Sequence, residues 1–220
     1  MSSQKYEKFS RIFLLAGLLS LVVAILTLAI LPATMVEDLG PQVGMPTEIP
    51  NDFKKYYSSL EEYHTALLHG RDVYISEACW HCHSQYVRPV SNEALRYGPV
   101  SQPGEYQNAL NLPQLFGTRR VGPDLVREAG KRPNDWHFAH LFNPKWVEPE
   151  SIMPRYSWYF DVKSKDGKPI QNLDAPDDNI IIEPKKEAVD LVAYLQWLGS
   201  EMMKDRYDGN TDDIIMPPTK

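Results

Sequence analysis

The sequence Cys79-Trp80-His81-Cys82-His83 has the form C-x-x-C-H. Two thiols three residues apart lie on neighbouring points of one helical turn, where each can bond one vinyl group of a haem lying against that turn. The next residue, His83, then directs its imidazole at the iron, and this spacing is the attachment signal for c-type haem. The stretch therefore predicts one covalent haem c, held by Cys79 and Cys82, with His83 as an axial iron ligand.

Two other uses of the cysteine pair are weaker. A thioredoxin-like redox pair belongs in a βαβ setting, which the surrounding sequence does not have. A structural zinc site needs four ligands, usually with a second Cys or His pair at a set spacing. His81 could join such a site, but it occupies one of the two free positions of the motif.

The composition fits a folded domain with a membrane anchor. The chain has 220 residues, of which 24% are charged and 43% hydrophobic, and its net charge is -6. A mildly acidic surface argues against nucleic acid as a partner and suits a basic protein partner. The 18 prolines and two cysteines predict a loop-rich domain without a disulfide framework, so another group must organise its core.

The N-terminal region contains an apolar run long enough to cross a membrane. Ile12–Leu31 has no charged residue, and a helix of this length spans about 30 Å, the thickness of a bilayer core. Lys and Arg precede the run and acidic residues follow it, which places the N-terminus in the cytoplasm and the rest of the chain outside. A cleaved signal peptide is the alternative, but its apolar region would be shorter and would end in small residues.

The remaining chain is expected to be mainly α-helical. It should form a loop-rich domain like that of class I cytochromes c, carrying a surface excursion with a turn at Asp166-Gly167. The expected parts are a cytoplasmic start and anchor over 1–35, a connector over 36–57, the haem domain over 58–200 with the excursion at 161–183, and a polar tail over 201–220.

The expected first helix leads into the haem motif. Ser58 and Glu61 have capping-box spacing and predict its start. Apolar residues recur at helical spacing up to Cys79, with a break expected at Gly70. The following residues, 84–133, are rich in proline and glycine and are predicted to form long, structured loops.

Two further helices are expected after these loops. Asn134 is a candidate N-cap for a helix that runs through Phe142 and stops before Asn143-Pro144. Pro184 is suited to be the first residue of the last helix, and Gly199 to be its stop. Its predicted apolar stripe consists of Leu191, Tyr194, Leu195 and Leu198.

Met153 is the candidate for the second axial ligand. An electron-transfer haem needs a closed iron, and methionine paired with histidine raises its potential. Met153 lies between two expected helices and is followed by Pro154, so its loop can present the sulfur rigidly. The rival ligands, which would give a bis-histidine haem, are His64, His69, His137 and His140.

Several residues are candidates for the haem surroundings. The neutral His83 ring needs an acceptor at its other nitrogen, and the carbonyl of Pro123 is the candidate. Arg88 and Arg120, with Arg119, could form paired bonds to the haem propionates, and the Trp136 indole and His140 could add donors. For each arginine the alternative is an ordinary solvated charge.

With these residues in place, the sequence closely resembles the monohaem cytochrome c subunit, subunit II or FixO/CcoO family, of cbb3-type cytochrome c oxidases. The likeness covers about two thirds of the chain. Its stretches are Gly70-Arg71-Asp72, Glu77 to Gln85, Arg88-Pro89, Arg96-Tyr97-Gly98, Gly104-Glu105, Arg120 to Leu125, Trp136-His137, His140-Leu141, Asn143-Pro144 and Pro149 to Pro154. Two parts depart from the family pattern: Asn108–Phe116 lacks the expected aromatic residues, and the 161–183 excursion is longer than expected.

The resemblance implies a function for the whole chain. It implies His83 and Met153 as the iron ligands, and electron delivery to the low-spin haem of a membrane-embedded haem–copper subunit that reduces oxygen. A further c-type cytochrome subunit or donor would supply the electrons, and the setting would be a bacterial inner membrane with the haem domain in the periplasm. The alternatives are the same role in a nitric-oxide-reducing relative, or a membrane-tethered electron shuttle, for which the connector is short.

Overall fold

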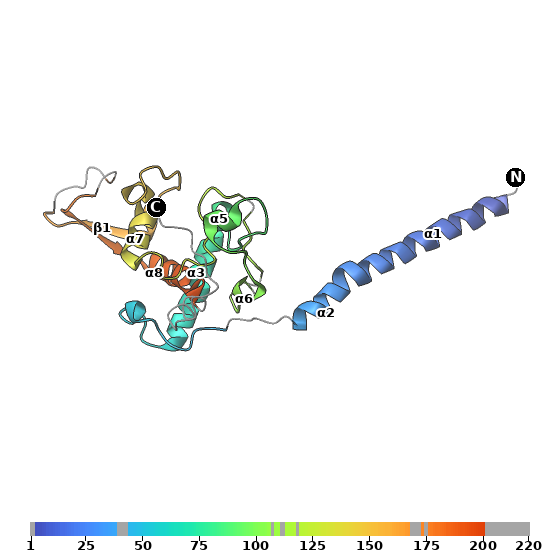
Figure 1. The fold of residues 1–220 in the computed structure, drawn as a ribbon, viewed down its shortest axis with the longest axis horizontal. Coiled ribbons are helices and arrows are strands. Elements are labelled where there is room, and N and C mark those ends of the chain that lie inside the picture. The colour runs from blue at the N-terminus through green and yellow to red at the C-terminus, as the bar shows by residue number, and fades with distance from the viewer. Residues whose placement is uncertain are drawn as a thin grey trace. The chain divides into compact units, whose positions relative to one another are not determined.

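The chain divides into two compact units, residues 1–41 and 42–220. The computed structural model describes residues 3–38, 44–106, 108–110, 113–117, 119–167, 173 and 176–200 (Figure 1). The predicted polar tail over 201–220, residues 39–43 of the connector, and residues 168–172 and 174–175 of the excursion lie outside this description.

The first unit is one continuous apolar helix. It consists of α1 (Ser3–Ile25), a π-helical turn η1 (Leu26–Ile30) and α2 (Leu31–Asp38). In the π-turn the Leu31 N–H donates to the carbonyl of Leu26, immediately before Pro32, which has no N–H to continue the ladder. Phe9–Met35 is long and apolar enough to cross a membrane, as the sequence predicts.

The second unit is mainly helical, also as predicted, and its elements follow the order η2, α3 to α7, η3, η4, the two strands and α8. The bounds are η2 Asn51–Phe53, α3 Leu60–Ser76, α4 Cys79–Cys82, α5 Glu93–Tyr97, α6 Pro103–Tyr106, α7 Asn134–Phe142, η3 Pro144–Trp146, η4 Ser157–Tyr159, β1 Phe160–Ser164, β2 Ile180–Pro184 and α8 Lys186–Trp197.

Helices α3 and α8 pack against each other in the core of this unit (Figure 1). The pair approaches closely at Gly70, where an added Cβ would lie 2.0 Å from the backbone oxygen of Asp190. Next to this contact, the Tyr74 and Tyr194 rings meet edge to face at 5.7 Å. Gly70 therefore permits the helix crossing, and the break predicted there is wrong, because α3 continues through it.

The start of α3 is one residue later than predicted. Ser59, not Ser58, is the N-cap, and its hydroxyl accepts from the Glu62 N–H at 3.2 Å. Ser58 contributes its own N–H to the Glu62 carboxylate at 2.8 Å. The capping box is thus present with Glu62 in place of Glu61.

The last helix differs from the prediction at its start but not at its end. Pro184 is the last residue of β2, and α8 begins at Lys186 with Lys185 as its N-cap. Pro184 ends the strand because it has no N–H to donate to a ladder. All four predicted stripe residues are buried, and Gly199 has φ +80°, the left-handed conformation expected where a helix stops.

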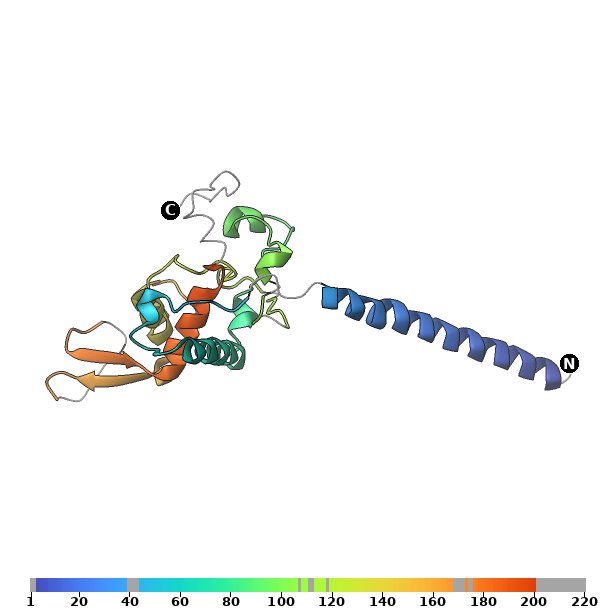
Figure 2. The same ribbon diagram turned by 90° about the horizontal axis from the view of Figure 1, so that it is seen from below.

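The excursion contains a β-hairpin that the sequence analysis did not predict. β1 pairs antiparallel with β2, with Phe160 opposite Pro184 and Ser164 opposite Ile180. Figure 2 shows the hairpin extending away from α3 and α8. Its inner side chains, Val162 and Ile182, pack partly buried against the core.

Helix α7 has the predicted bounds but not the predicted cap. It covers Asn134–Phe142 and stops before Asn143-Pro144, while Pro133 occupies the N-cap position. The Asn134 side chain instead accepts from the Gln196 amide at 2.9 Å. That bond connects α7 to α8 rather than capping α7.

Candidate haem-binding site

The C-x-x-C-H motif forms a single helical turn directly after α3. Ala78 stands between α3 and α4 in the left-handed conformation, with φ 55° and ψ 31°. This residue redirects the chain so that Cys79 and Cys82 lie on the new turn, where both side chains are half-buried. Burial, with a smaller contribution from Glu77, raises the pKa of the Cys79 thiol to about 12.

His83 is held by two neighbouring backbone segments. Its Nδ1 lies 2.9 Å from the carbonyl oxygen of Pro123, so the neutral ring donates there and keeps the lone pair of Nε2 for a metal. Burial lowers the pKa of His83, although the Pro123 carbonyl and the Asp124 charge oppose that effect. The Tyr74 hydroxyl donates to the backbone carbonyl of His83 at 3.0 Å. The predicted partner of His83 is therefore in place.

A glycine allows the loop to lie flat against this imidazole. A Cβ at Gly122 would come within 2.2 Å of the His83 Cε1 atom and 2.7 Å of Nε2. The Gly122 N–H also donates to the carbonyl of Cys82 at 3.0 Å, and the Leu125 N–H donates to Ser84 at 2.9 Å. The loop around Gly122 is thus hydrogen-bonded to the backbone of the residues immediately before and after His83.

Met153 lies on a loop that reaches the motif through two tyrosines. Its N–H donates to the Ser151 hydroxyl at 3.2 Å, and its side chain packs partly buried against the core. Three residues later, Tyr156 lies near Cys79, whose proximity adds to the burial that raises the pKa of the Tyr156 hydroxyl. Tyr159 donates to the carboxylate of Glu77, two residues before Cys79. The loop is therefore fixed beside the cysteines, while ligation by Met153 stays a prediction.

Two of the rival histidines are engaged elsewhere. The ring of His64 is 2.7 Å from the Pro46 carbonyl oxygen. The Nδ1 of His69 is 2.6 Å from the carboxylate of Asp190, on α8. These contacts tie the start of the unit and α8 to α3 and use a ring nitrogen of each histidine.

The histidines of α7 lie nearer the motif. Burial lowers the pKa of both His137 and His140 to about 4, and the proximity of His83 adds to the effect on His140. The Trp136 ring stacks on His140 at 4.6 Å and 11°. The Nδ1 of His140 is buried and has no hydrogen-bond partner. A bound group with an acceptor would satisfy this atom, which fits the predicted place of Trp136 and His140 in the haem surroundings.

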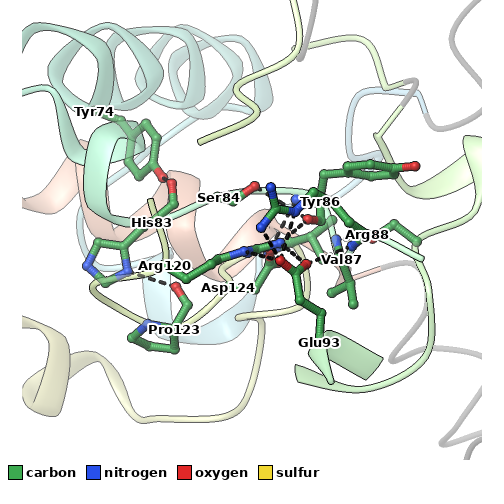
Figure 3. A network of polar contacts seen from close by, with 12 residues as sticks. Tyr74, His83, Ser84, Tyr86, Val87, Arg88, Glu93, Arg120, Pro123 and Asp124 are labelled. Carbon is green, nitrogen blue, oxygen red and sulfur yellow. Dashed lines mark hydrogen bonds and ion pairs between the residues drawn. The ribbon is translucent and has the colours of Figure 1, made fainter. Parts of the chain in front are cut away.

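Arg88 and Arg120 both pair with carboxylates of the chain itself. The Arg88 Nε donates to Glu93 at 2.7 Å, and Arg120 donates to Glu93 at 2.6 Å and to Asp124 (Figure 3). Burial alone would raise the pKa of Glu93, but the bonds from the two arginines outweigh it and bring the pKa to about 2. Sequence reasoning missed both carboxylates: Glu93 is five residues from Arg88 and Asp124 is four from Arg120, but no local pattern shows that these charges meet, and the Arg120–Glu93 pair spans 27 residues. The propionate role of both arginines stays a prediction.

The donor set fits a c-type haem. One helical turn carries the two cysteines and is followed directly by His83, whose Nε2 has no partner in the described part of the chain. The loop that covers this segment places Gly122 against the His83 ring. Over the residues that the structure describes, no three His, Cys, Asp or Glu side chains are grouped to hold a metal ion. His81 is stacked on Trp80 at 3.9 Å. The zinc alternative therefore lacks its ligand set in this part of the chain.

These features define a small, mainly helical domain with a candidate haem site, joined to one apolar helix. The family model described as cytochrome c oxidase, mono-heme subunit/FixO matches residues 11–176. The chain belongs to this family, as its resemblance to subunit II of cbb3-type oxidases predicts. It is therefore a monohaem subunit of a cytochrome c oxidase, and its apolar helix fits a single-pass anchor. No curated protein matches the sequence.

Proposed function

We propose that this chain carries one haem c, bonded through Cys79 and Cys82, and passes electrons to the low-spin haem of the membrane-embedded haem–copper subunit. His83 and Met153 are the axial ligands, and the haem domain, of the class I cytochrome c type, lies in the periplasm with the N-terminus in the cytoplasm. The observation that carries this proposal is the 2.9 Å contact between His83 Nδ1 and the Pro123 carbonyl, next to the cysteine pair.

The chain's own groups prepare the site for electron transfer. The bound haem supplies the one-electron couple. The Pro123 carbonyl fixes the tautomer and orientation of the His83 ring, and the Tyr74 hydroxyl holds the backbone of the same residue. A closed iron, with both axial positions filled by His83 and Met153, restricts the site to electron transfer. The oxygen-reducing chemistry belongs to the partner subunit.

Purification of the full chain in mild detergent tests the proposal. An oxidase subunit brings with it a complex that contains further haem types and consumes oxygen. A chain that purifies alone, with its haem reducible, would instead support a tethered shuttle, and turnover with nitric oxide but not oxygen would support the reductase alternative.

The ligand assignment has its own test. Met153→Ala should abolish the methionine–iron absorption band and lower the haem potential, because the soft thioether favours ferrous iron. The matched control is Met45→Ala, since Met45 also packs partly buried against the core. An unchanged band in Met153→Ala would remove Met153 as the ligand.

A further inference from the structure

Four charged side chains form a largely buried cluster behind the Pro123 carbonyl (Figure 3). They are Arg88, Glu93, Arg120 and Asp124. The side chains of Glu93, Arg120 and Asp124 are 7%, 10% and 2% exposed, so water screens their charges poorly. Buried charges of this kind require partners, and here two arginines face two carboxylates.

Arg120 connects the two segments that meet at the His83 ring. One is the segment after the motif, where Arg120 donates to the backbone carbonyl of Tyr86. The other is the segment of Pro123, where Arg120 pairs with the adjacent Asp124. The same Asp124 carboxylate accepts from the Tyr86 N–H at 3.1 Å. Tyr86 is three residues after His83, so the cluster clamps together the imidazole and its acceptor.

The guanidinium group of Arg120 is enclosed on several sides. It donates to Glu93 from Nε at 3.2 Å and from Nη2 at 2.6 Å. It also lies over the Tyr97 ring, 5.1 Å from the centroid. Only the planar guanidinium group of an arginine can stack on a ring and donate several hydrogen bonds at once. A lysine at this position would reproduce only the charge.

The charges of the cluster cancel. With Arg88 and Arg120 positive and Glu93 and Asp124 negative, the sum is zero. Loss of Arg120 leaves one uncompensated negative charge, and loss of Glu93 leaves one positive charge. Reduction adds an electron to the haem, so a nearby uncompensated negative charge opposes reduction and a positive charge favours it.

We propose that Arg120 is a positioning residue for the His83 ligand, and that the charge-balanced cluster Arg88–Glu93–Arg120–Asp124 sets the reduction potential of the haem. This inference rests on the proposed function, in which His83 binds the iron. In this inference, Arg120 supports the segment that carries the Pro123 carbonyl, the acceptor of the His83 ring, and does not bind a haem propionate.

Redox titration of the haem-loaded full-length protein tests the sign of the effect. Arg120→Gln should lower the equilibrium constant for reduction about tenfold, which is ~60 mV for one electron. Glu93→Gln should raise the same constant about tenfold. A purely structural role would loosen the His83–Pro123 contact in both variants and shift both potentials in the same direction.

Three further variants sharpen the test. Arg120→Lys keeps the charge but not the planar guanidinium group, so its reduction constant should stay within about threefold of the parent. The double variant Arg120→Gln/Glu93→Gln restores a zero sum and should also return close to the parent. Arg96→Gln is the matched control: Arg96 lies 5.0 Å from the same Tyr97 ring but is exposed, so its loss should change the constant less than about twofold.

The outcomes separate this inference from the proposed function. Shifts of the same sign in the two single variants, or a double variant displaced as far as either of them, would overturn the inference. If one single variant does not accumulate, the sign of the shift in the other still decides, and an unchanged or oppositely shifted potential overturns the inference. A parent protein without haem would overturn the proposed function itself.

Discussion

The two predicted axial ligands are held by the chain in different ways. His83 is fixed by main-chain contacts: the Pro123 carbonyl accepts from its ring, and Gly122 lies against the ring face. Met153 lies on a loop fixed by side-chain hydroxyl groups, with Ser151 at its N–H and Tyr159 reaching Glu77. A main-chain cradle changes only if the fold changes, whereas a hydroxyl contact can be lost singly. The methionine side should therefore loosen first.

The largest expected effect comes from adding a side chain at Gly122, which lies against the His83 ring. Gly122→Ala places a Cβ 2.2 Å from the His83 ring, so the ring or the loop must move. We expect haem loading to fall at least about tenfold and the free energy of unfolding to drop by about 3 kcal/mol. Haem content per chain and thermal unfolding measure the two effects. Gly44→Ala is the control, because no atom lies within 4 Å of its added Cβ. Equal losses of haem and stability in both variants would contradict the role of Gly122 beside the His83 ring.

The buried ion pairs on the histidine side make stability depend on pH. The pKa of Glu93 is about 2 in the folded chain, below its ordinary value of 4.5. Its contribution is complete above about pH 4.5 and is lost as the pH falls toward 2, for a total of about 3 kcal/mol. The stability gap between the parent and Glu93→Gln should therefore shrink over that range. A gap that stays constant down to pH 2.5 would contradict the role of Glu93.

On the methionine side, the expected effect is smaller. Tyr159→Phe removes only the hydroxyl that donates to Glu77, which should cost about 2 kcal/mol for a hydrogen bond to a charged group. The methionine–iron band should then disappear at a lower denaturant concentration than the global unfolding transition. A double-mutant cycle with Glu77→Gln isolates the pair, and a coupling energy near zero would argue against this contact.

The smallest effect has the opposite sign. Ala78 is a non-glycine residue with φ 55°, a conformation that costs about 1 kcal/mol or more for a residue with a Cβ. Ala78→Gly should raise the free energy of unfolding by roughly 0.5–1 kcal/mol, since the gain is partly offset by the entropy of the unfolded chain. Denaturant titration measures it, and a destabilised Ala78→Gly variant would show that Ala78 makes a contact worth more than the strain.

Local patterns in the sequence were sufficient for the parts of the fold that repeat regularly. The stripe of α8 and the stop at Gly199 were predicted from spacing alone. The haem motif likewise carries its chemistry in five consecutive residues. Cap positions were less accurate, because Ser58 and Ser59 both have a glutamate three residues later and only the fold selects between them.

The rest depends on contacts between distant residues. The hairpin of β1 and β2 was not predicted because its two strands are short and separated by a long polar stretch. From local sequence alone, Gly70 predicts a break in the helix. Its contact with the Asp190 backbone depends on how α3 and α8 pack, which the local sequence does not show. The Arg120–Glu93 and Tyr159–Glu77 pairs join residues 27 and 82 positions apart, so no local pattern predicts them.

The intact mass of the full-length chain, measured under denaturing conditions, tests the central claim most directly. The account predicts the mass of the polypeptide plus one haem, with no free thiol at Cys79 or Cys82 and loss of the added mass in Cys79→Ala/Cys82→Ala. A chain with the bare polypeptide mass and two titratable thiols, from cells able to attach haem c, would contradict it.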